Sequence, residues 1–222
     1  MRTLGRITLS TKTKHVRDKW RGKSWYMIVA PPFFGNIELG SVPSEGEEHL
    51  LGRIVEATLY DITGDFSHMY LKMFFQVNEI DGKTAKTLFK GHEYSRDYLR
   101  SLVRRRTTKV DGLFNLTTKD GYKLRIAVSA LTLSRIKTSQ EKIIRNLMQR
   151  ITGEKAKALM LDSFVQEMVL GKIGSDVYNE AKKVAPLRHV GIRKSKLVGQ
   201  PAQSAQPIQE KVPVPEAETA EA

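Results

Sequence analysis

Arginine is the residue type best suited to chemistry in this sequence. Three arginines, Arg104–Arg106, follow one another in the stretch RSLVRRRTTKVDG. A guanidinium group presents its N–H donors in a planar fork, so it can contact a phosphate through two hydrogen bonds and can also stack on a nucleobase. The triplet therefore indicates binding to a nucleic-acid backbone.

The triplet lies in a strongly basic part of the chain. From Arg96 to Lys155, fifteen lysines and arginines stand against five acids. The whole chain has 37 Lys+Arg against 24 Asp+Glu, a formal net charge of +13, and its pI is about 9.9. A single arginine is most simply interpreted as a solvated surface residue. When lysines and arginines outnumber the acids by this much, their positive charges repel one another unless an anion binds. The composition therefore predicts a polyanionic partner.

Nucleic acid and an anionic membrane are the two candidate polyanions. The apolar runs are only a few residues long, whereas a membrane span needs roughly 18 consecutive apolar residues. The pattern therefore favours nucleic acid and argues against a membrane partner. The lack of an apolar signal segment favours a cytoplasmic protein. With no cysteine in the chain, disulfides, thiolate metal sites and cysteine nucleophiles are excluded.

Other arrangements that would carry catalysis are incomplete. Both Gly-Lys-Ser/Thr matches, Gly22–Ser24 and Gly82–Thr84, lack the glycine that a phosphate-binding loop needs five positions earlier. The carboxylates of the stretch SEGEEH are interpreted as a solvated acidic loop. Histidines without paired metal-ligand spacing are interpreted as surface or turn residues, namely His15, His49, His68, His92 and His189. We therefore predict no enzyme, no metal and no cofactor.

The fold that must position the basic residues is predicted to be α+β. Residues 25–134 consist mostly of short runs rich in apolar and β-branched residues, and Asp-Gly pairs at residues 81–82 and 120–121 each separate two such runs. This arrangement is typical of a β-hairpin. Several short strands at this spacing predict a mostly antiparallel β-barrel core over residues 25–134.

One interior helix is predicted over residues 96–105, with Ser95 as its N-cap. At 100° per residue, four apolar side chains fall in one arc: Tyr98, Leu99, Leu102 and Val103. Three arginines form a row on the opposite side: Arg96, Arg100 and Arg104. Arg105 and Arg106 then belong to the last turn or to the loop beyond it, so the charge borders the core and does not enter it.

After residue 134 the apolar period changes to 3.6, which predicts a helical appendage over residues 138–184. Its first helix begins at Thr138 and ends at Gly153, and its third begins near Ser175. A final strand is predicted over residues 187–198.

These elements predict three regions along the chain. A single globular domain covers residues 25–198. A basic N-terminal arm covers residues 1–24, and a disordered acidic tail, rich in Pro, Ala, Gln and Glu, covers residues 199–222.

Two tryptophans, Trp20 and Trp25, are interleaved with basic residues near the N-terminus. Both are candidates for stacking on bases. Trp25 is interpreted first as a core residue, because it starts the apolar run WYMIVA.

Four segments, in this order, resemble a known family: DKWRGKSWYMIVAPPFFGNIELG, FKGHEYSRDYLRSLVRRR, TTKDGYKLRIAVSALT and PLRHVGIRKSKLV. Together they resemble the archaeal and eukaryotic small-subunit ribosomal proteins of the S-three-A-e (S-one-e) family, over about residues 19–198. The resemblance implies a β-barrel with helices and a structural ribosomal protein without catalytic activity. It implies a seat on the platform of the small subunit near the messenger exit region. The implied partners are small-subunit rRNA and neighbouring ribosomal proteins, with messenger RNA and initiation factors as further contacts.

Short motifs carry this resemblance to individual residues. The family's tryptophan–aromatic step and Ala-Pro step match Trp25-Tyr26 and Ala30-Pro31, with a structural role implied. Its Arg-Asp pair and the basic segment after the helix match Arg96-Asp97 and Arg104–Arg106, and its later Arg-Lys matches Arg193-Lys194. The short acidic tail departs from the basic extension of eukaryotic relatives, which favours an archaeal source.

The leading hypothesis is a ribosome-bound protein that binds small-subunit rRNA and supports translation. Its predicted RNA-binding residues are Lys19, Arg21, Lys23, Arg96, Arg100, Arg104, Arg105, Arg106, Lys109, Arg135, Lys137, Arg193, Lys194 and Lys196. The alternative is a single-strand nucleic-acid-binding barrel protein that acts off the ribosome. The alternative needs exposed aromatics such as Phe74, Phe75 and Phe89, whereas the simpler interpretation places these three in the core.

Overall fold

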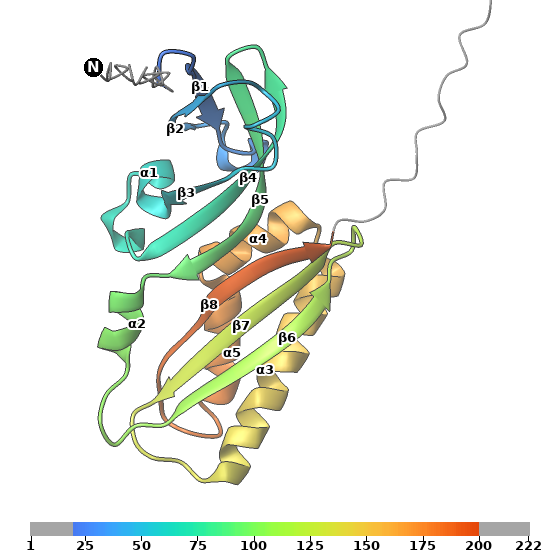
Figure 1. Ribbon diagram of the computed structural model, residues 1–222. Coiled ribbons are helices and arrows are strands. Elements are labelled where there is room, and N and C mark those ends of the chain that lie inside the picture. The colour runs from blue at the N-terminus through green and yellow to red at the C-terminus, as the bar shows by residue number, and fades with distance from the viewer. Residues whose placement is uncertain (1–19, 200–222) are drawn as a thin grey trace, which may run out of the picture. The chain divides into compact units, whose positions relative to one another are not determined.

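The computed structural model describes residues 20–199 (Figure 1). Residues 200–222 of the predicted acidic tail, most of the basic arm and the candidate Lys19 therefore lie outside the described residues, whereas Gly199 belongs to β8. The elements in chain order are β1 (Ser24–Val29), the 3-10 helix η1 (Pro32–Phe34), β2 (Glu38–Ser44), β3 (Ile54–Thr58), α1 (Leu59–Thr63), the 3-10 helix η2 (Phe66–His68), β4 (Leu71–Asp81), β5 (Thr84–Tyr94), α2 (Arg96–Leu102), β6 (Lys109–Thr117), β7 (Lys123–Thr132), α3 (Thr138–Ala158), α4 (Leu161–Val169), α5 (Lys172–Ala181) and β8 (Leu187–Gly199).

These elements form two compact units. Unit 1 contains the described residues up to Ala57 together with Phe74–Phe89, and unit 2 contains Thr58–Met73 and the described residues from Lys90 onward. Strands β4 and β5 contribute residues to both units. The single globular domain over residues 25–198 stays a prediction.

Eight strands are hydrogen-bonded into one mixed sheet, so the α+β class is confirmed. The strand order is β2-β1-β5-β8-β7-β6, with β4 beside β5 and β3 beside β4. The pair β1–β5 is parallel, whereas β1–β2, β5–β8, β6–β7 and β7–β8 are antiparallel. Within residues 20–199 this pairing does not close on itself, so the predicted barrel is not confirmed. Asp-Gly signals specify local hairpins, but closure requires pairing between strands far apart in sequence, which no local signal encodes.

Both predicted hairpins are present. Strand β4 pairs with β5 across Gly82, and β6 pairs with β7 across Gly121, each glycine having a positive φ (60° and 81°). Such left-handed turn positions favour glycine because a Cβ atom strains them.

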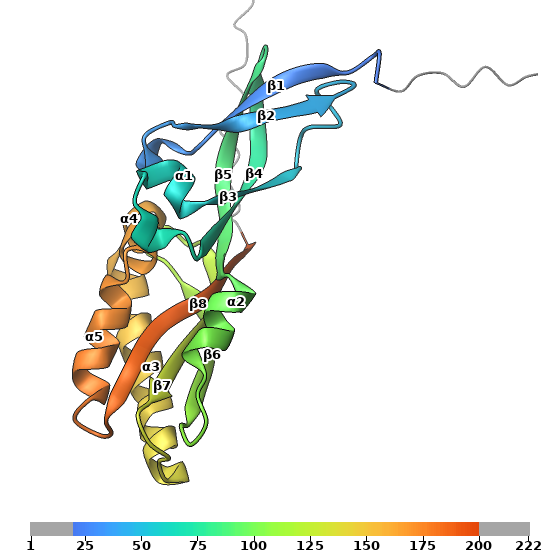
Figure 2. The ribbon, with the colours of Figure 1, turned by 90° about the vertical axis from the view of Figure 1, so that its left-hand side faces the viewer.

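Strands β1 and β2 of unit 1 run side by side (Figure 2), and the inward-facing residues of β1 belong to the core of this unit. A cluster of buried residues forms it: Tyr26, Ile28, Leu50, Val77 and Ala85. Phe75 and Phe89 are also fully buried, as the simpler interpretation expects, and Phe74 is half-buried. The alternative function therefore loses two of the three exposed aromatics that it needs.

In unit 2, helices α3, α4 and α5 cover one side of β6, β7 and β8 (Figure 1). Strand β7 turns one set of alternate residues toward these helices, and its members Leu124, Ile126, Val128 and Ala130 are buried. The other set, which includes Lys123 and Arg125, lies on the opposite side because successive strand residues point to opposite faces. Further along β7, Ala127, Ser129 and Leu131 of this second set are also buried, so the side without helices is exposed at the end that carries Lys123 and Arg125.

Two helix ends differ from the prediction. Helix α2 ends at Leu102 and not at residue 105, because Val103 has extended backbone (φ −81°, ψ 124°). Helix α3 continues through Gly153 to Ala158. A glycine inside a helix costs only about 1 kcal/mol, and Ala156 beyond it still packs on the buried face, so the helix does not end there.

The remaining C-terminal predictions are close to the structure. Helix α5 begins at Lys172, three residues before the expected start. The final strand β8 covers Leu187–Gly199. Among residues 20–199, no helix is long and apolar enough to cross a membrane.

Candidate RNA-binding surface

The predicted RNA-binding residues are accessible where the structure describes them. None of the thirteen described candidates is buried, and only Lys23 and Arg193 are half-buried. Arg21 and Lys23 lie in unit 1. In unit 2, nine candidates lie in three places, and the other two, Lys109 and Arg193, lie near Asp111.

The first place is one end of the sheet in unit 2, where two loops run together. Thr108 Oγ1 accepts a hydrogen bond from Ile136 N (3.3 Å), and Thr108 O accepts one from Thr132 N (3.1 Å). These bonds join the loop between α2 and β6 to the loop between β7 and α3. We call the five basic residues of the two loops the end cluster: Arg104, Arg105, Arg106, Arg135 and Lys137.

The end cluster carries uncompensated charge. All five side chains are exposed, and none forms a salt bridge with a carboxylate among residues 20–199. Thr107 Oγ1 donates to Arg104 O (2.7 Å), and Arg106 takes a left-handed backbone conformation (φ 62°). The local turn therefore points the chain back toward β6 while the arginine side chains stay in solvent.

The second place is the exposed end of the sheet side that carries no helix, around Lys123 and Arg125 of β7. Arg125 of β7 lies directly opposite Lys196 of β8, and Ala127 lies opposite Lys194. Directly opposite residues in antiparallel strands share a face. We call the four basic residues on this face the sheet-face cluster: Lys123, Arg125, Lys194 and Lys196.

The hydrogen bonds of the sheet-face cluster orient its side chains. Arg125 Nε donates to Asn115 Oδ1 on β6 (2.9 Å), which fixes the guanidinium group without neutralising it. Lys194 Nζ lies 2.9 Å from Glu93 Oε2 on β5, so this lysine is partly compensated. The cluster retains a net positive charge on a surface built from separate strands.

Sequence reasoning missed Lys123 and Arg125 as candidate site residues. The strand alternation around the Asp-Gly turn could have placed both on the side opposite Leu124 and Ile126. What the sequence could not show is that β8 pairs with β7, because that contact joins segments about 70 residues apart. Only this pairing brings Arg125 beside Lys196.

Lys109 and Arg193 both interact with the carboxyl group of Asp111. Asp111 Oδ2 lies 3.0 Å from Lys109 Nζ, and Asp111 Oδ1 accepts a hydrogen bond from Ser129 Oγ (2.6 Å). Burial alone would raise the pKa of Asp111, but the Ser129 and Lys109 hydrogen bonds lower it below its ordinary value. Arg193 is the extra residue of a β-bulge, because Ala127 pairs with Lys194 and Val128 pairs with Ile192. The positive charges of both residues help to lower the pKa of the half-buried Asp111 carboxyl group.

The third place is helix α2. Arg96 and Arg100 are exposed on it, whereas Arg104 lies beyond its end, so the predicted row has two members. On the other side Tyr98 stacks on Tyr70, with ring centroids 3.9 Å apart. Val103, predicted on the apolar arc, is exposed instead.

The tryptophans of unit 1 correct one prediction. Trp25 was expected in the core, but 60% of its surface is exposed. Strand β1 alternates, so Tyr26 and Ile28 point into the core and Trp25 points out. Lys23 Nζ lies 4.3 Å from the centroid of the Trp20 ring, which is a cation–π contact.

One histidine also corrects a prediction. His92 of β5 was expected at the surface or in a turn, but it is only 1% exposed. Its two ring nitrogens have protein partners, Ser195 Oγ and Ile192 O. Because both ring nitrogens are hydrogen-bonded, the imidazole ring can be buried without leaving a polar atom unsatisfied.

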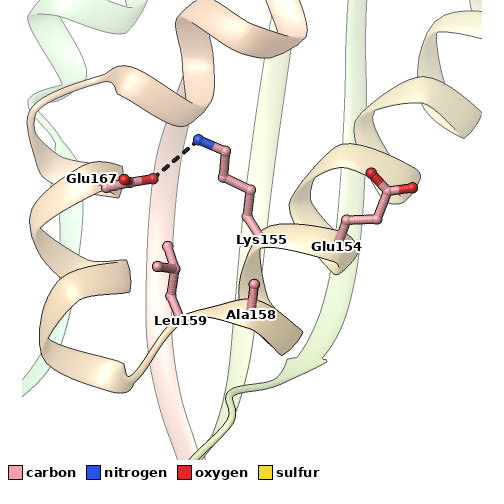
Figure 3. A pocket seen from close by; sticks show the side chains of 5 residues that line it. All are labelled: Glu154, Lys155, Ala158, Leu159 and Glu167. Atoms are coloured by element: carbon pink, nitrogen blue, oxygen red, sulfur yellow. Dashed lines mark hydrogen bonds and ion pairs between the residues drawn. The ribbon is translucent and has the colours of Figure 1, made fainter.

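A pocket of about 310 Å³ lies among the helices of unit 2 (Figure 3). Lys155, Glu154 and Glu167 line it together with two apolar residues. Lys155 Nζ lies 3.1 Å from Glu167 Oε2 and 2.5 Å from Asp176 Oδ2, so its charge is compensated. Among the described residues no cluster of His, Asp and Glu could hold a metal ion. The one cation of this pocket is therefore not free to hold a phosphate.

Comparison with known proteins identifies the family. Residues 11–201 match the family model described as the Ribosomal S3Ae family. Three relatives, each named small ribosomal subunit protein eS1, come from archaea. That of Desulfurococcus amylolyticus is 50% identical over 82% of this chain and 86% of its own length. That of Staphylothermus marinus is 47% identical over 82% of this chain and 86% of its own length. That of Sulfurisphaera tokodaii is 45% identical over 87% of this chain and 100% of its own length. The chain therefore belongs to the Ribosomal S3Ae family, whose members are structural, non-enzymatic proteins of the small ribosomal subunit.

Proposed function

We propose that this chain binds small-subunit rRNA through the end cluster and the sheet-face cluster of unit 2, and thereby holds its place in the subunit. The observation that carries the proposal is the end cluster, in which five basic residues from two loops have no carboxylate partner among residues 20–199. Five cations on two loops that are hydrogen-bonded to each other repel one another in the free protein. An rRNA backbone relieves that repulsion, so the cluster stabilises the bound state.

The sheet-face cluster supports the same partner by its geometry. Arg125 is held by Asn115 and lies beside Lys196, so two cations occupy neighbouring positions on a flat surface. Prior ordering of a guanidinium group lowers the entropy cost of contacting a phosphate. Phosphate contacts position a protein on RNA without reading its sequence, so we expect little sequence preference from either cluster.

The family resemblance supplies the finer parts of the proposal. These are a seat on the platform near the messenger exit region, contacts with neighbouring ribosomal proteins, and access to messenger RNA and initiation factors. The relatives' name supports the small subunit as the location. The exposed, unpaired cations support rRNA as the first partner.

Salt dependence of RNA binding by the full chain tests the proposal. Each phosphate contact contributes about 0.7 to 0.9 to the slope of log affinity against log salt concentration. We therefore expect a steep slope for an rRNA fragment. Substituting Arg104, Arg105 and Arg106 together by alanine should reduce the slope by about 2 to 3 and weaken binding at least about tenfold at low salt.

A matched control removes three exposed lysines outside both clusters, Lys119, Lys157 and Lys172. This control changes the net charge by the same amount, so it isolates position from total charge. Equal losses in the two triple variants would show that net charge alone drives binding, and the assignment of the end cluster would then be wrong.

A further inference from the structure

The outer face of β1 and β2 in unit 1 presents a tryptophan that the core does not use. Trp25 is 60% exposed and Met27, on the same face, is 38% exposed. Trp25 lies directly opposite Pro43 of β2, and Met27 lies opposite Ser41. The ring of Trp25 is therefore part of a flat surface on the strand pair, next to small side chains that leave it uncovered.

A surface pocket of about 330 Å³ adjoins this tryptophan. Its lining residues come from three segments of unit 1: Lys23, Pro43, Ser44, Glu45, His49 and Arg53. Pro43 is the cross-strand neighbour of Trp25, and Lys23 precedes Trp25 by two residues. The exposed ring and the pocket are thus parts of one continuous surface.

The pocket has the charge that a phosphate group needs. Lys23 and Arg53 contribute two positive charges, and Glu45 is the one acid among the lining residues. Arg53 Nη1 donates to Pro43 O (3.3 Å), which directs the guanidinium group toward β2 and leaves its other donors for a ligand.

A base and a phosphate are held together only in a nucleotide, which makes RNA the best match for this surface. Aromatic rings that stack on bases, with cations nearby for the backbone, are typical of single-strand binding sites. On the far side of Met27, Lys86 is already paired with Asp81 and Glu79. Lys83, whose carbonyl oxygen accepts a hydrogen bond from Met27 N, is exposed and adds a further positive charge on that side. A protein partner would use Trp25 but would not need Lys23 and Arg53.

We propose that this face of unit 1 binds an unpaired nucleotide of RNA, whose base stacks on Trp25 and whose phosphate lies in the pocket between Lys23 and Arg53. The inference rests on the proposed function in one respect, since it takes RNA as the partner. It adds a second mode of recognition, because stacking needs an unpaired base and the basic clusters of unit 2 need only phosphates.

Tryptophan fluorescence gives a direct test, because the chain has two tryptophans. The variant Trp20→Phe leaves Trp25 as the one tryptophan. Its emission should be quenched when an unstructured 12-nucleotide RNA of mixed sequence is added, and much less by a blunt duplex of the same strands. Absence of quenching at RNA concentrations that saturate binding would overturn the proposal.

Affinity measurements separate stacking from charge. We expect Trp25→Ala to weaken binding of the single-stranded RNA roughly 5- to 150-fold, with an unchanged salt slope. Leu51→Ala, which removes an exposed apolar side chain of the same unit, is the control and should bind normally. Circular dichroism of both variants checks that they fold.

The double variant Lys23→Ala with Arg53→Ala should instead lower the salt slope by about 1. Native affinity in the Trp25→Ala variant, with steep salt dependence retained, would refute the stacking site and leave the proposed function intact. Weak, salt-independent binding of the native chain to every RNA would refute the proposed function itself.

Discussion

His92 is held neutral by its surroundings in β5. Ile192 O lies 2.9 Å from its Nε2 and can only accept, so Nε2 carries the proton. Nδ1 then accepts from the hydroxyl of Ser195, 2.7 Å away, while Ser195 Oγ accepts from the backbone N–H of His92 (3.1 Å). Burial lowers the pKa of His92 to about 4, because a charged ring would lose its hydration.

This histidine makes stability depend on pH in a defined direction. Between the ordinary pKa of about 6.5 and the folded pKa of about 4, the unfolded chain binds a proton that the folded chain does not. The contribution of His92 to the free energy of unfolding is therefore complete above pH 6.5 and falls by about 1.4 kcal/mol per pH unit below it.

Urea denaturation at several pH values between 4 and 7.5 measures this contribution. His92→Gln cannot titrate, so its free energy of unfolding should vary less with pH than that of the native chain. His189, whose pKa is also lowered by burial, acts equally in both proteins. If the free energy of unfolding changed with pH in the same way in both proteins, the pKa of His92 would not be lowered by folding.

Two glycines of the secondary-structure elements have different roles, because one lies in a tight contact between strands and the other lies in open space on a helix. A Cβ atom on Gly91 of β5 would collide with the backbone of Ser195 and Lys196 in β8. A Cβ atom on Gly153 inside α3 would meet nothing within 4 Å. The first glycine therefore permits the β5–β8 contact, and the second only weakens a helix.

Alanine at these two positions should shift stability in opposite directions. Gly91→Ala should lower the free energy of unfolding by about 1 to 3 kcal/mol through overpacking. Gly153→Ala should raise it by about 0.5 to 1 kcal/mol, because alanine has less backbone freedom to lose in a helix. Chemical denaturation of both variants beside the native chain is the measurement. If Gly153→Ala lowered the free energy of unfolding, the added methyl group would have to meet a neighbouring atom, and the open space at Gly153 would be contradicted.

For the whole molecule, family membership places the chain in a cytoplasmic, ribosome-bound ribonucleoprotein that serves translation. The basic residues of unit 2 then act as a group, since each surface cation alone contributes little in water. A chain that folds normally could still fail to assemble if one cluster were removed.

Sucrose-gradient profiles of cell extracts test this consequence for assembly. The variant with Arg104, Arg105 and Arg106 replaced by alanine should keep the native unfolding midpoint, because these side chains are exposed and make no salt bridges among residues 20–199. Its share in the small-subunit peak should fall relative to the native chain after a moderate-salt wash. Normal incorporation of the variant would contradict a role for the end cluster.

Features that depend on neighbouring residues were predictable from the sequence. Asp-Gly turns specified the hairpins β4–β5 and β6–β7, and the 3.6-residue period specified the helices of unit 2. The excess of basic residues specified the kind of partner. Local signals were weaker at boundaries, as at Gly153, where the cost of one glycine is smaller than the gain from packing the residues beyond it.

Which distant segments meet became known from the structure and not from the sequence. Pairing of β7 with β8 brings Arg125 beside Lys196, and hydrogen bonds of Thr108 join the loop of Arg135 to the loop of the arginine triplet. The structure also shows that Trp25 faces solvent and that His92 is buried. These outcomes follow from the strand register and from packing summed over many contacts, and no short stretch of sequence carries that information.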